Sequence, residues 1–482
     1  MPDISCPLLR RFRAVVEHRP NSVAVSSPEA VIAYRELWED ALSWRNRLLA
    51  LAPSTHSSVA ILSNGSSALV PAFLGARAAG LVPLLVDTTM PPGRRGDMIR
   101  ASGAVAVVHT ASRSANPVDG GDPGRFPAEA GYIVFSSGSQ GRPKGIIGNA
   151  AGVAAFLDWE QELLGLGSTV RGALLTTPSF DVVLRDMLLP LLAGGVLCVP
   201  RPEIRTDPSS VIVWLRDNKV NVVHVVPSMS TRWVAASVSI RLPGLRWSLF
   251  AGEPLYARHV ERWRSVAPST RVVNLYGPSE TTLAKYFHVI EGPPRFGLQP
   301  VGHGLPGTRL EAHPCDPAAD DGSFRIALET PDGSLGYLPD GLSAADSAAL
   351  TRRDGITRFV SQDRGRLGAD GVLTVEGRLD GVVKRNGIMV DLTDVTAKSL
   401  TDPHVAQACC LQVDPDASGS IILAVEVTAG FSMRQLTGRL RRTLGPAMPN
   451  QVVCFDPLPM LPNGKVDRLA VRDALQGRMR RR

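Results

Sequence analysis

Short apolar runs recur between residues 59 and 277, and segments with helical spacing of apolar positions separate many of them. Several runs contain almost no polar residue, as expected of parallel strands that helices cover on both faces. Residues 66–80 and 181–195 show the clearest helical spacing. Strands that alternate with helices predict a parallel α/β fold. The predicted strands lie within 59–64, 81–87, 104–110, 132–137, 173–178, 195–200, 220–227, 247–253 and 271–277.

The pattern changes after about residue 290, where glycine and proline become more frequent and apolar runs become shorter. This change predicts a small β-rich subdomain. The last hundred or so residues mix helix and strand signals, so we expect a second, smaller α+β domain. We predict a core at 1–379, built of two stacked α/β subdomains and the β-rich subdomain, and a C-terminal domain at 380–482. Segments 112–128 and 339–355 are expected to be irregular loops.

Composition narrows the class of protein. The chain has 482 residues, of which 44% are hydrophobic and 20% charged, as in soluble globular proteins. A formal net charge of +7 is spread along the chain apart from a basic end at 478–482, and no basic stretch is interleaved with aromatic residues. No run approaches the roughly 20 apolar residues that span a bilayer. We therefore expect neither a nucleic acid nor a membrane as partner.

Cysteine and histidine usage bears on compartment and metal binding. The six cysteines form no CxxC motif, and the nine histidines form no HxxxH pair. The start of the chain also lacks the order of charge, apolar core and small residues that a signal peptide shows. We expect reduced cysteines, a cytoplasmic location and no zinc site built from protein side chains.

A glycine-rich loop follows the predicted strand at 132–137, in the stretch YIVFSSGSQGRPKG. Small residues let backbone N–H groups approach an anion, the serine hydroxyls add donors, and Lys144 adds a positive charge. The loop lacks the GxxxxGK[ST] spacing of a Walker A motif. It predicts a phosphate site, although a flexible turn after a strand would have the same composition.

Taken with the motifs around it, this loop resembles that of the adenylate-forming superfamily, and specifically the amino-acid adenylation domains of nonribosomal peptide synthetases. The resemblance covers nearly the whole chain, with its motifs in the family's order. These motifs are IAYREL (32–37), LGARAAGLVPLLVD (74–87), FSSGSQGRPKG (135–145), SFDVV (179–183), NLYGPSE (274–280), FVSQD (359–363), GRLDGVVKRNG (377–387) and NGKVDR (463–468).

The resemblance implies ATP and Mg²⁺ as cofactors and gives each motif a role. Activation of a carboxylate by ATP needs groups that align two anions and neutralise charge on the phosphates. Glu280 would hold Mg²⁺, which accepts a carboxylate together with phosphate oxygens. The triphosphate would be bound by Ser136, Ser137, Gly138, Ser139, Gly141 and Lys144, with Gln140 in place of the usual threonine. The nucleoside would be bound by Gly252, Asn274, Tyr276, which would stack on adenine, Asp363, which would accept the ribose hydroxyls, and Arg378.

Lys465 is the catalytic residue that the resemblance implies. It follows Asn463 and Gly464, which predict a tight turn that would project the lysine into the cleft. Its ammonium group would bridge the substrate carboxylate and the α-phosphate of ATP. Asp380 would be the hinge about which the C-terminal domain rotates, after which a phosphopantetheine thiol would accept the acyl group. We find no carrier domain in the sequence, so a separate carrier protein is the expected partner.

Asp181 and Arg185 bear on the substrate. By resemblance, Asp181 would pair with a substrate amino group, which favours an amino acid, although it could equally cap the helix expected at 182–193. Arg185 stands where many relatives have an apolar residue. An unpaired guanidinium would be costly there, so its partner is either Asp181 or Asp186, or a second carboxylate on the substrate. The other expected pocket residues are Val182, Ser228, Leu249, Ala251, Leu275, Leu283 and Ala284.

The predicted function is therefore ATP-dependent formation of an aminoacyl-AMP, followed by transfer to a carrier protein in natural-product biosynthesis. We favour a dicarboxylic amino acid such as aspartate, glutamate or a methylated or β-amino relative. One alternative is an acyl- or aryl-CoA ligase of the same fold, against which Asp181 argues. Another is a non-catalytic scaffold paralogue, which the unusual Gln140 and Gln362 would suit. Intact Glu280, Asp363 and Lys465 argue against a scaffold.

Overall fold

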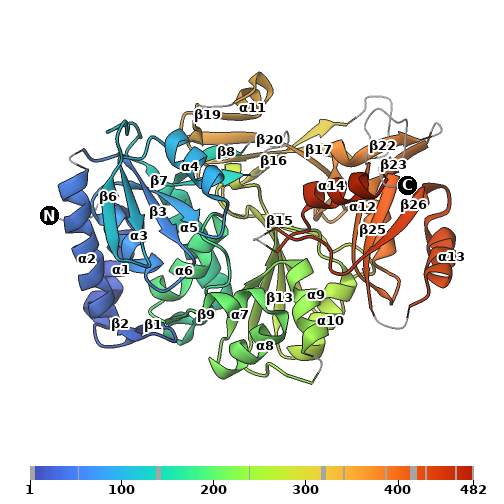
Figure 1. The fold of residues 1–482 in the computed structure, drawn as a ribbon, viewed down its shortest axis with the longest axis horizontal. Helices are drawn as coiled ribbons and strands as arrows, with labels where there is room; N and C mark the ends of the chain where they lie inside the picture. The colour runs from blue at the N-terminus through green and yellow to red at the C-terminus, as the bar shows by residue number, and fades with distance from the viewer. Residues whose placement is uncertain are drawn as a thin grey trace.

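The computed structural model places the N-terminal helices at one end of the molecule and the elements from β22 onward at the other (Figure 1). The structure describes residues 6–52, 54–136, 143–237, 239–315, 322–339, 342–385, 388–412, 421–428, 431–461 and 464–479. Among these residues, no helix combines the length and apolarity that a membrane crossing requires.

The larger sheet is parallel at its centre and antiparallel at its edges. Its central strands are buried on both faces, which explains their nearly continuous apolar sequences. In spatial order its strands are β15 (His303–Gly304), β14 (Tyr286–Ile290), β13 (Arg271–Tyr276), β12 (Trp247–Ala251), β11 (Val222–Val225), β9 (Arg171–Ala173), β10 (Val196–Cys198), β1 (Val23–Ser26) and β2 (Val31–Ala33).

A second mixed sheet carries the strand that leads into the glycine-rich loop. That strand, β7 (Ala130–Ser136), lies next to the parallel strand β4 (Val82–Asp87) and forms a hairpin with β8 (Lys144–Asn149). The hairpin places Ser136 opposite Lys144. The remaining strands are β18 (Gly336–Tyr337) beside β8, and β3 (Ser58–Ser63), β5 (Ala106–His109) and β6 (Ser114–Pro117) beyond β4.

Helices α5 (Ala150–Leu164) and α6 (Val182–Leu192) pack against each other between the two sheets, since α5 contacts β7 and β8 while α6 contacts β9 and β10. One apolar cluster includes residues of both helices and both sheets, so the two α/β layers share a core. The other helices of this part are α1 (Pro7–His18), α2 (Tyr34–Leu51), α3 (Leu69–Ala78), α4 (Pro92–Ala101), α7 (Pro202–Thr206), α8 (Pro208–Asp217), α9 (Pro227–Ala236) and α10 (Ala257–Val266), with 3₁₀ turns η1 (Gly167–Thr169) and η2 (Ser279–Thr281).

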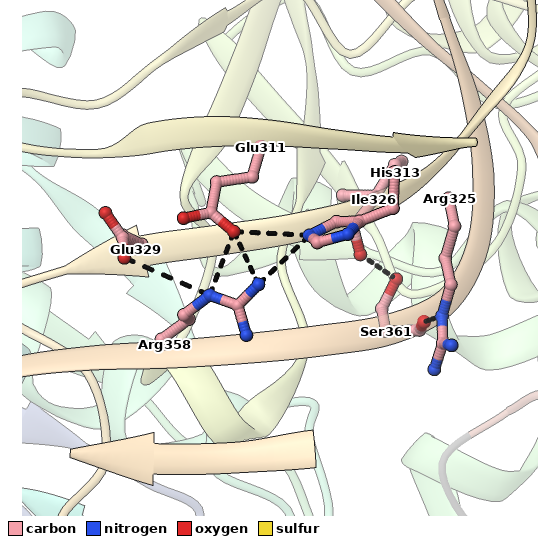
Figure 2. Close-up of polar contacts among 7 residues, drawn as sticks. All are labelled: Glu311, His313, Arg325, Ile326, Glu329, Arg358 and Ser361. Atoms are coloured by element: carbon pink, nitrogen blue, oxygen red, sulfur yellow. Dashed lines mark hydrogen bonds and ion pairs between the residues drawn. The ribbon is translucent and has the colours of Figure 1, made fainter. Parts of the chain in front are cut away.

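The β-rich subdomain is an antiparallel sheet held partly by charged side chains. Figure 2 shows Arg358 donating to Glu311 at 2.6 and 2.9 Å and lying 4.0 Å from Glu329, so that one guanidinium links three neighbouring strands. The strands are β16 (Arg309–Pro314), β17 (Phe324–Thr330), β20 (Ile356–Leu367), β19 (Leu350–Arg353) and β21 (Leu373–Arg378). Helix α11 (Ala344–Ala349) precedes β19.

The C-terminal segment has apolar clusters of its own, built mainly from residues between 383 and 475, with Tyr256 joining from the earlier part of the chain. It begins at the 3₁₀ turn η3 (Leu379–Gly381), which contains Asp380. Its elements are β22 (Val382–Arg385), β23 (Ile388–Asp391), α12 (Leu392–Ser399), β24 (Val405–Gln412), β25 (Ile421–Val427), α13 (Met433–Leu444), the 3₁₀ turn η4 (Gly445–Ala447), β26 (Gln451–Phe455) and α14 (Arg468–Met479).

These elements confirm the predicted α/β fold class, with three local differences. The strand expected within 173–178 is β9, which begins at Arg171 and ends at Ala173. The observed strand therefore overlaps the expected range only at Ala173. The two segments expected to be irregular contain β6, and α11 with β19. Polar composition concealed these elements: β6 is an edge strand, and α11 starts from a Ser343–Asp346 capping box.

Candidate functional site

Six of the seven predicted pocket-wall residues lie in or against the apolar core that the two α/β layers share, and three of them are on the neighbouring strands β12 and β13. Ala251 and Leu275 are paired across these strands. Leu249, Leu275, Leu283 and Ala284 belong to the shared apolar core, and Val182 and Ala251 pack against it. Ser228 differs from the others, because its hydroxyl donates to the carbonyl oxygen of Gly464, 2.5 Å away, in the C-terminal segment.

Asp181 lies at the start of α6 and is only 6% exposed. Although it precedes the first residue of the helix, its side chain makes no capping hydrogen bond, so the side-chain cap considered above does not form. The carboxylate instead accepts hydrogen bonds from Ser279 and from the backbone N–H of Leu283. Burial raises the pKa of Asp181, and these bonds together with the charge of Arg185 offset only part of the rise.

The backbone beside Asp181 is strained. Thr282 and Leu283 both have left-handed φ angles, of 63° and 59°, which a β-branched residue such as threonine rarely adopts. This conformation turns the Leu283 N–H toward Asp181. Residues held in sparsely populated conformations cluster at functional sites, so the strain is consistent with a binding site here.

Arg185 is buried in the same wall, with 3% of its surface exposed. Its Nε has no hydrogen-bond partner, and among the described residues no carboxylate lies within 4 Å of its guanidinium. Asp186 is engaged elsewhere, because its Oδ1 lies 2.8 Å from His224 Nδ1 and its Oδ2 accepts the N–H of Thr176 at 3.0 Å. Neither intramolecular ion pair considered for Arg185 is therefore formed in this part of the chain.

His224 lies between two buried acids. Its Nε2 is 2.9 Å from Glu160 on α5, and its Nδ1 faces Asp186 on α6. Burial and the charge of Arg185 favour the neutral ring, but the two carboxylates outweigh them and raise the pKa of His224. The sequence offered no signal for this group, because its members are far apart in the chain. By engaging Asp186, His224 leaves Arg185 without that partner.

Three of the five predicted nucleoside residues form a connected group on the β-rich sheet and β13. The Tyr276 hydroxyl donates to Asp363 Oδ2 at 2.6 Å, and Arg378 lies 3.7 Å from Asp363 Oδ1. Asn274 is turned toward the backbone, where its side-chain amide donates to the Pro300 carbonyl at 2.8 Å. The Asn274 amide therefore holds the backbone at residues 299–300, and this N–H is not available to a ligand.

Ser361 orients the strand that carries Asp363. Its hydroxyl donates to the Ile326 carbonyl at 3.0 Å (Figure 2), where the pairing of β17 and β20 is irregular. The same hydroxyl accepts the N–H of Asp363 at 2.9 Å. Bulges of this kind commonly redirect a side chain beside a site. Arg364, which replaces an apolar residue of the family motif, forms an ion pair with Asp391 at 2.7 Å.

Glu280 and Lys144 each have a partner that the sequence did not indicate. Tyr337 donates its hydroxyl to Glu280 Oε1 at 2.8 Å, and Lys144 forms an ion pair with Asp346 of α11. Burial raises the pKa of Glu280, while the bond from Tyr337 and the charge of Lys144 oppose the rise. Glu280 offers a metal ion a single carboxylate, and the described residues contain no group of three or more potential metal ligands. Mg²⁺ suits such a site, because it takes one or two carboxylates with substrate phosphates.

Several predicted residues lie outside the described residues or are described only in part. Ser137, Gly138, Ser139, Gln140 and Gly141 are outside. Ser136 ends β7, at the edge of that segment, and Asp380 lies in η3.

Lys465 of the C-terminal segment lies against Gly252, which follows β12. Gly252 has a φ of +88°, and a Cβ atom there would lie 2.9 Å from Cε of Lys465. The absence of a side chain at Gly252 therefore makes room for the lysine. This contact brings the predicted catalytic residue next to the ends of the pocket strands.

We expect Gly252→Ala to impair both folding stability and adenylate formation. Alanine in left-handed backbone costs about 1–2 kcal/mol of unfolding free energy, and its Cβ displaces Lys465. Chemical denaturation and a pyrophosphate-exchange assay measure the two effects. Gly244→Ala is the matched control, because a Cβ there meets nothing within 4 Å. Equal behaviour of the two variants would contradict the role given to Gly252.

Comparisons with known proteins identify the family to which the chain belongs. The family model for AMP-binding enzymes matches residues 12–127 and 126–317. A dimodular nonribosomal peptide synthase of Bacillus subtilis is 27% identical over 94% of this chain, which spans only 20% of that relative's length. The L-proline--[L-prolyl-carrier protein] ligase of Pseudomonas fluorescens is 26% identical, over 95% of this chain and 97% of its own.

The crystal structure of IdnL7 has the same fold, with a TM-score of 0.80, 24% identity, and coverage of 97% of this chain and 98% of its own. The family model covers well over half of the chain, in the part that contains the pocket wall, Asp181, Glu280 and the glycine-rich loop. The chain belongs to the AMP-binding enzymes of the adenylate-forming superfamily.

Proposed function

We propose that this protein activates an amino acid as an aminoacyl-AMP and transfers it to a separate carrier protein. In the first step, the substrate carboxylate attacks the α-phosphorus of ATP, the bond from this phosphorus to the bridging oxygen breaks, and pyrophosphate leaves. In the second step, a phosphopantetheine thiol attacks the acyl carbon and AMP leaves. The buried carboxylate of Asp181 is the observation that carries the amino-acid part, since it provides a partner for a substrate ammonium group.

We propose that the site residues have different roles in the first step. We propose that Lys144 and the loop residues from Ser136 to Gly141 bind the phosphates, while Tyr276, Asp363 and Arg378 bind the nucleoside. Mg²⁺ held by Glu280 would neutralise charge on the phosphates. Lys465 would hold the substrate carboxylate and the α-phosphate together, which is largely what this chemistry needs from a protein. The hydrogen bond between Tyr276 and Asp363 supports the nucleoside assignment, because it brings the predicted adenine and ribose residues together.

We propose that residues 1–379 form the core that binds ATP and the amino acid, and that 380–482 form the mobile domain, with Asp380 as its hinge. The separate apolar clusters of the C-terminal segment support this division. A separate carrier protein is supported by the proline ligase, which matches this chain over nearly its whole length and is named for a carrier-protein substrate.

The substrate that we propose is a dicarboxylic amino acid, such as aspartate, glutamate or a methylated or β-amino relative. This proposal rests on Arg185, which is buried and forms no ion pair with the described residues. A buried guanidinium without an anion is costly, and a second substrate carboxylate could satisfy it through two hydrogen bonds. Asp181 would pair with the substrate's amino group, and Arg185 would pair with a carboxylate of the substrate.

The test is ATP–pyrophosphate exchange across a panel of neutral, dicarboxylic and β-amino acids. We expect exchange with a dicarboxylic acid, and we expect Arg185→Leu to lower kcat/KM for that acid about 30-fold or more by removing a buried charge partner. Exchange with alanine or valine should not fall. Arg216→Leu, at a half-exposed arginine on α8, is the control. Strong exchange with valine or alanine, and none with aspartate or glutamate, would overturn the dicarboxylate proposal.

The same assay separates the alternatives. Formation of a thioester on free CoA from an acyl or aryl acid would indicate a CoA ligase. A well-folded protein that catalyses no pyrophosphate exchange with any acid would favour a scaffold, which Gln140 and Gln362 would suit. Asp181 argues against the first, and the presence of Glu280, Asp363 and Lys465 at the positions of the family motifs argues against the second.

A further inference from the structure

The start of α9 is tied to the turn that carries Lys465. Ser228 is the second residue of this helix, so its N–H has no partner within the helix. That N–H donates to Glu253 Oε2 at 3.0 Å, and the Ser228 hydroxyl donates to the Gly464 carbonyl. The Ser228 carbonyl accepts the side-chain amide of Gln407, on β24, at 2.9 Å. One buried residue therefore joins two parts of the C-terminal segment to the core.

Glu253 contacts both sides of this junction. Besides the Ser228 N–H, its carboxylate accepts the backbone N–H of Val466, the residue after Lys465. Burial raises the pKa of Glu253, while the bonds from Ser228 and the nearby charge of Lys465 oppose the rise. Because Gly252 directly precedes Glu253 and supports the Lys465 side chain, both the backbone and the side chain of the lysine turn are fixed from one loop.

A second group of polar contacts extends the junction along α9 and α10. Arg232 donates to Glu426 at 2.8 Å and to the Leu458 carbonyl at 3.1 Å. Arg258 donates to the Val405 carbonyl at 2.6 Å. These helices face the orange and red C-terminal elements in Figure 1.

We propose that Ser228, Glu253 and Gln407 form a latch that holds the C-terminal segment in the position where Lys465 reaches the pocket. This inference rests on the proposed function of Lys465. The three are positioning residues, since they contact the lysine turn and its support. Movement of the C-terminal segment away from the core requires the bonds of Ser228 to Gly464 and to Gln407 to break. The strength of the latch therefore sets how much of the protein has Lys465 in place.

Removal of a latch contact should affect turnover more than substrate binding, because Asp181 and Arg185 lie outside the latch. Gln407→Leu is the preferred variant, since it removes the amide from the C-terminal side and leaves the pocket wall untouched. Ser228→Ala removes the hydroxyl from the core side. Ser230→Ala is the matched control on the same helix, because the Ser230 hydroxyl is also buried but donates within α9, to Pro227.

Two measurements test the latch. We expect Gln407→Leu and Ser228→Ala to lower kcat of pyrophosphate exchange about five- to tenfold, the factor that one buried hydrogen bond represents. KM for the amino acid should change less than about twofold in Gln407→Leu, which leaves the pocket wall intact. Hydrogen–deuterium exchange of the peptide at 464–467 should become faster in both variants and stay unchanged in Ser230→Ala. This second measurement needs no substrate, so it tests the latch even if no acid supports exchange.

Unchanged deuterium uptake at 464–467 in both latch variants would overturn the proposal, as would a loss of activity in Gln407→Leu that appears in KM alone. Failure of the proposed function would look different: the wild-type protein would show no pyrophosphate exchange, while the variants would still expose the 464–467 peptide. Faster deuterium uptake throughout the core in Gln407→Leu would indicate that this variant unfolds. Deuterium uptake at 464–467 in Ser228→Ala would then decide whether the latch exists.

Discussion

Lys465→Ala should lower the rate of adenylate formation about 10²–10³-fold, the loss that follows removal of one group stabilising charge at a reacting centre. The Lys465 side chain lies on Gly252, at the ends of the pocket strands, where its ammonium can hold two anions together. ATP should still bind, because the proposed phosphate and nucleoside residues belong to the core. Single-turnover formation of the adenylate, together with equilibrium ATP binding, measures the two effects.

Lys398→Ala provides the control for this substitution. Lys398 lies on α12 of the same C-terminal segment, where it pairs with Asp394 at the surface. Its replacement should leave adenylate formation at the wild-type rate. If Lys465→Ala also retained that rate, the catalytic assignment would be wrong.

Asp181→Asn should lower kcat/KM for the amino acid about 30-fold or more, since it removes one partner of a buried charge pair. Asparagine has the same shape, and its single amide oxygen can still accept a hydrogen bond from this wall, so the fold should be retained. Pyrophosphate exchange with the preferred amino acid measures the effect. Asp158→Asn, at an exposed acid of α5, is the control.

The pH dependence of the wild-type enzyme provides a second measurement of the same role. Burial raises the pKa of Asp181, so the carboxyl becomes protonated at a higher pH than an ordinary aspartic acid. A protonated Asp181 cannot pair with an ammonium group, and kcat/KM should fall as the pH drops through this raised pKa. Asp181→Asn should lack this acidic limb. A variant that keeps both the wild-type kcat/KM and the limb would refute the proposed ammonium contact.

The sequence predicted the layers of the fold because the strands themselves are distinctive. Strands β3, β4 and β12 are short, apolar and buried on both faces, which a sequence pattern records directly. Strand β6 and helix α11 escaped prediction, since neither has an apolar face of its own. Strand β6 is recognisable only through its pairing with β5, and Asp346 of α11 gains its partner Lys144 from a part of the chain that is remote in the sequence.

The candidate site shows the same limit at the level of side chains. Motif order predicted a role for each of Asp181, Glu280 and Lys465, because each belongs to a recognisable stretch. Their partners could not be predicted in this way: Lys144 and Asp346 are 202 positions apart, and nothing near either residue indicates the other. Ser228 shows a further limit, since its position beside the pocket was expected but the direction of its hydroxyl depends on Gly464.

The conformation of Thr282 has a consequence for efforts to make this protein more heat-resistant. A left-handed threonine weakens the fold, and glycine at this position would relieve the strain. Glycine would also let the chain beside Asp181 adopt several conformations, so the N–H of Leu283 would no longer be held toward the carboxylate. Selection for thermal tolerance alone would therefore favour variants that discriminate less well between acids, and a useful screen has to score both properties.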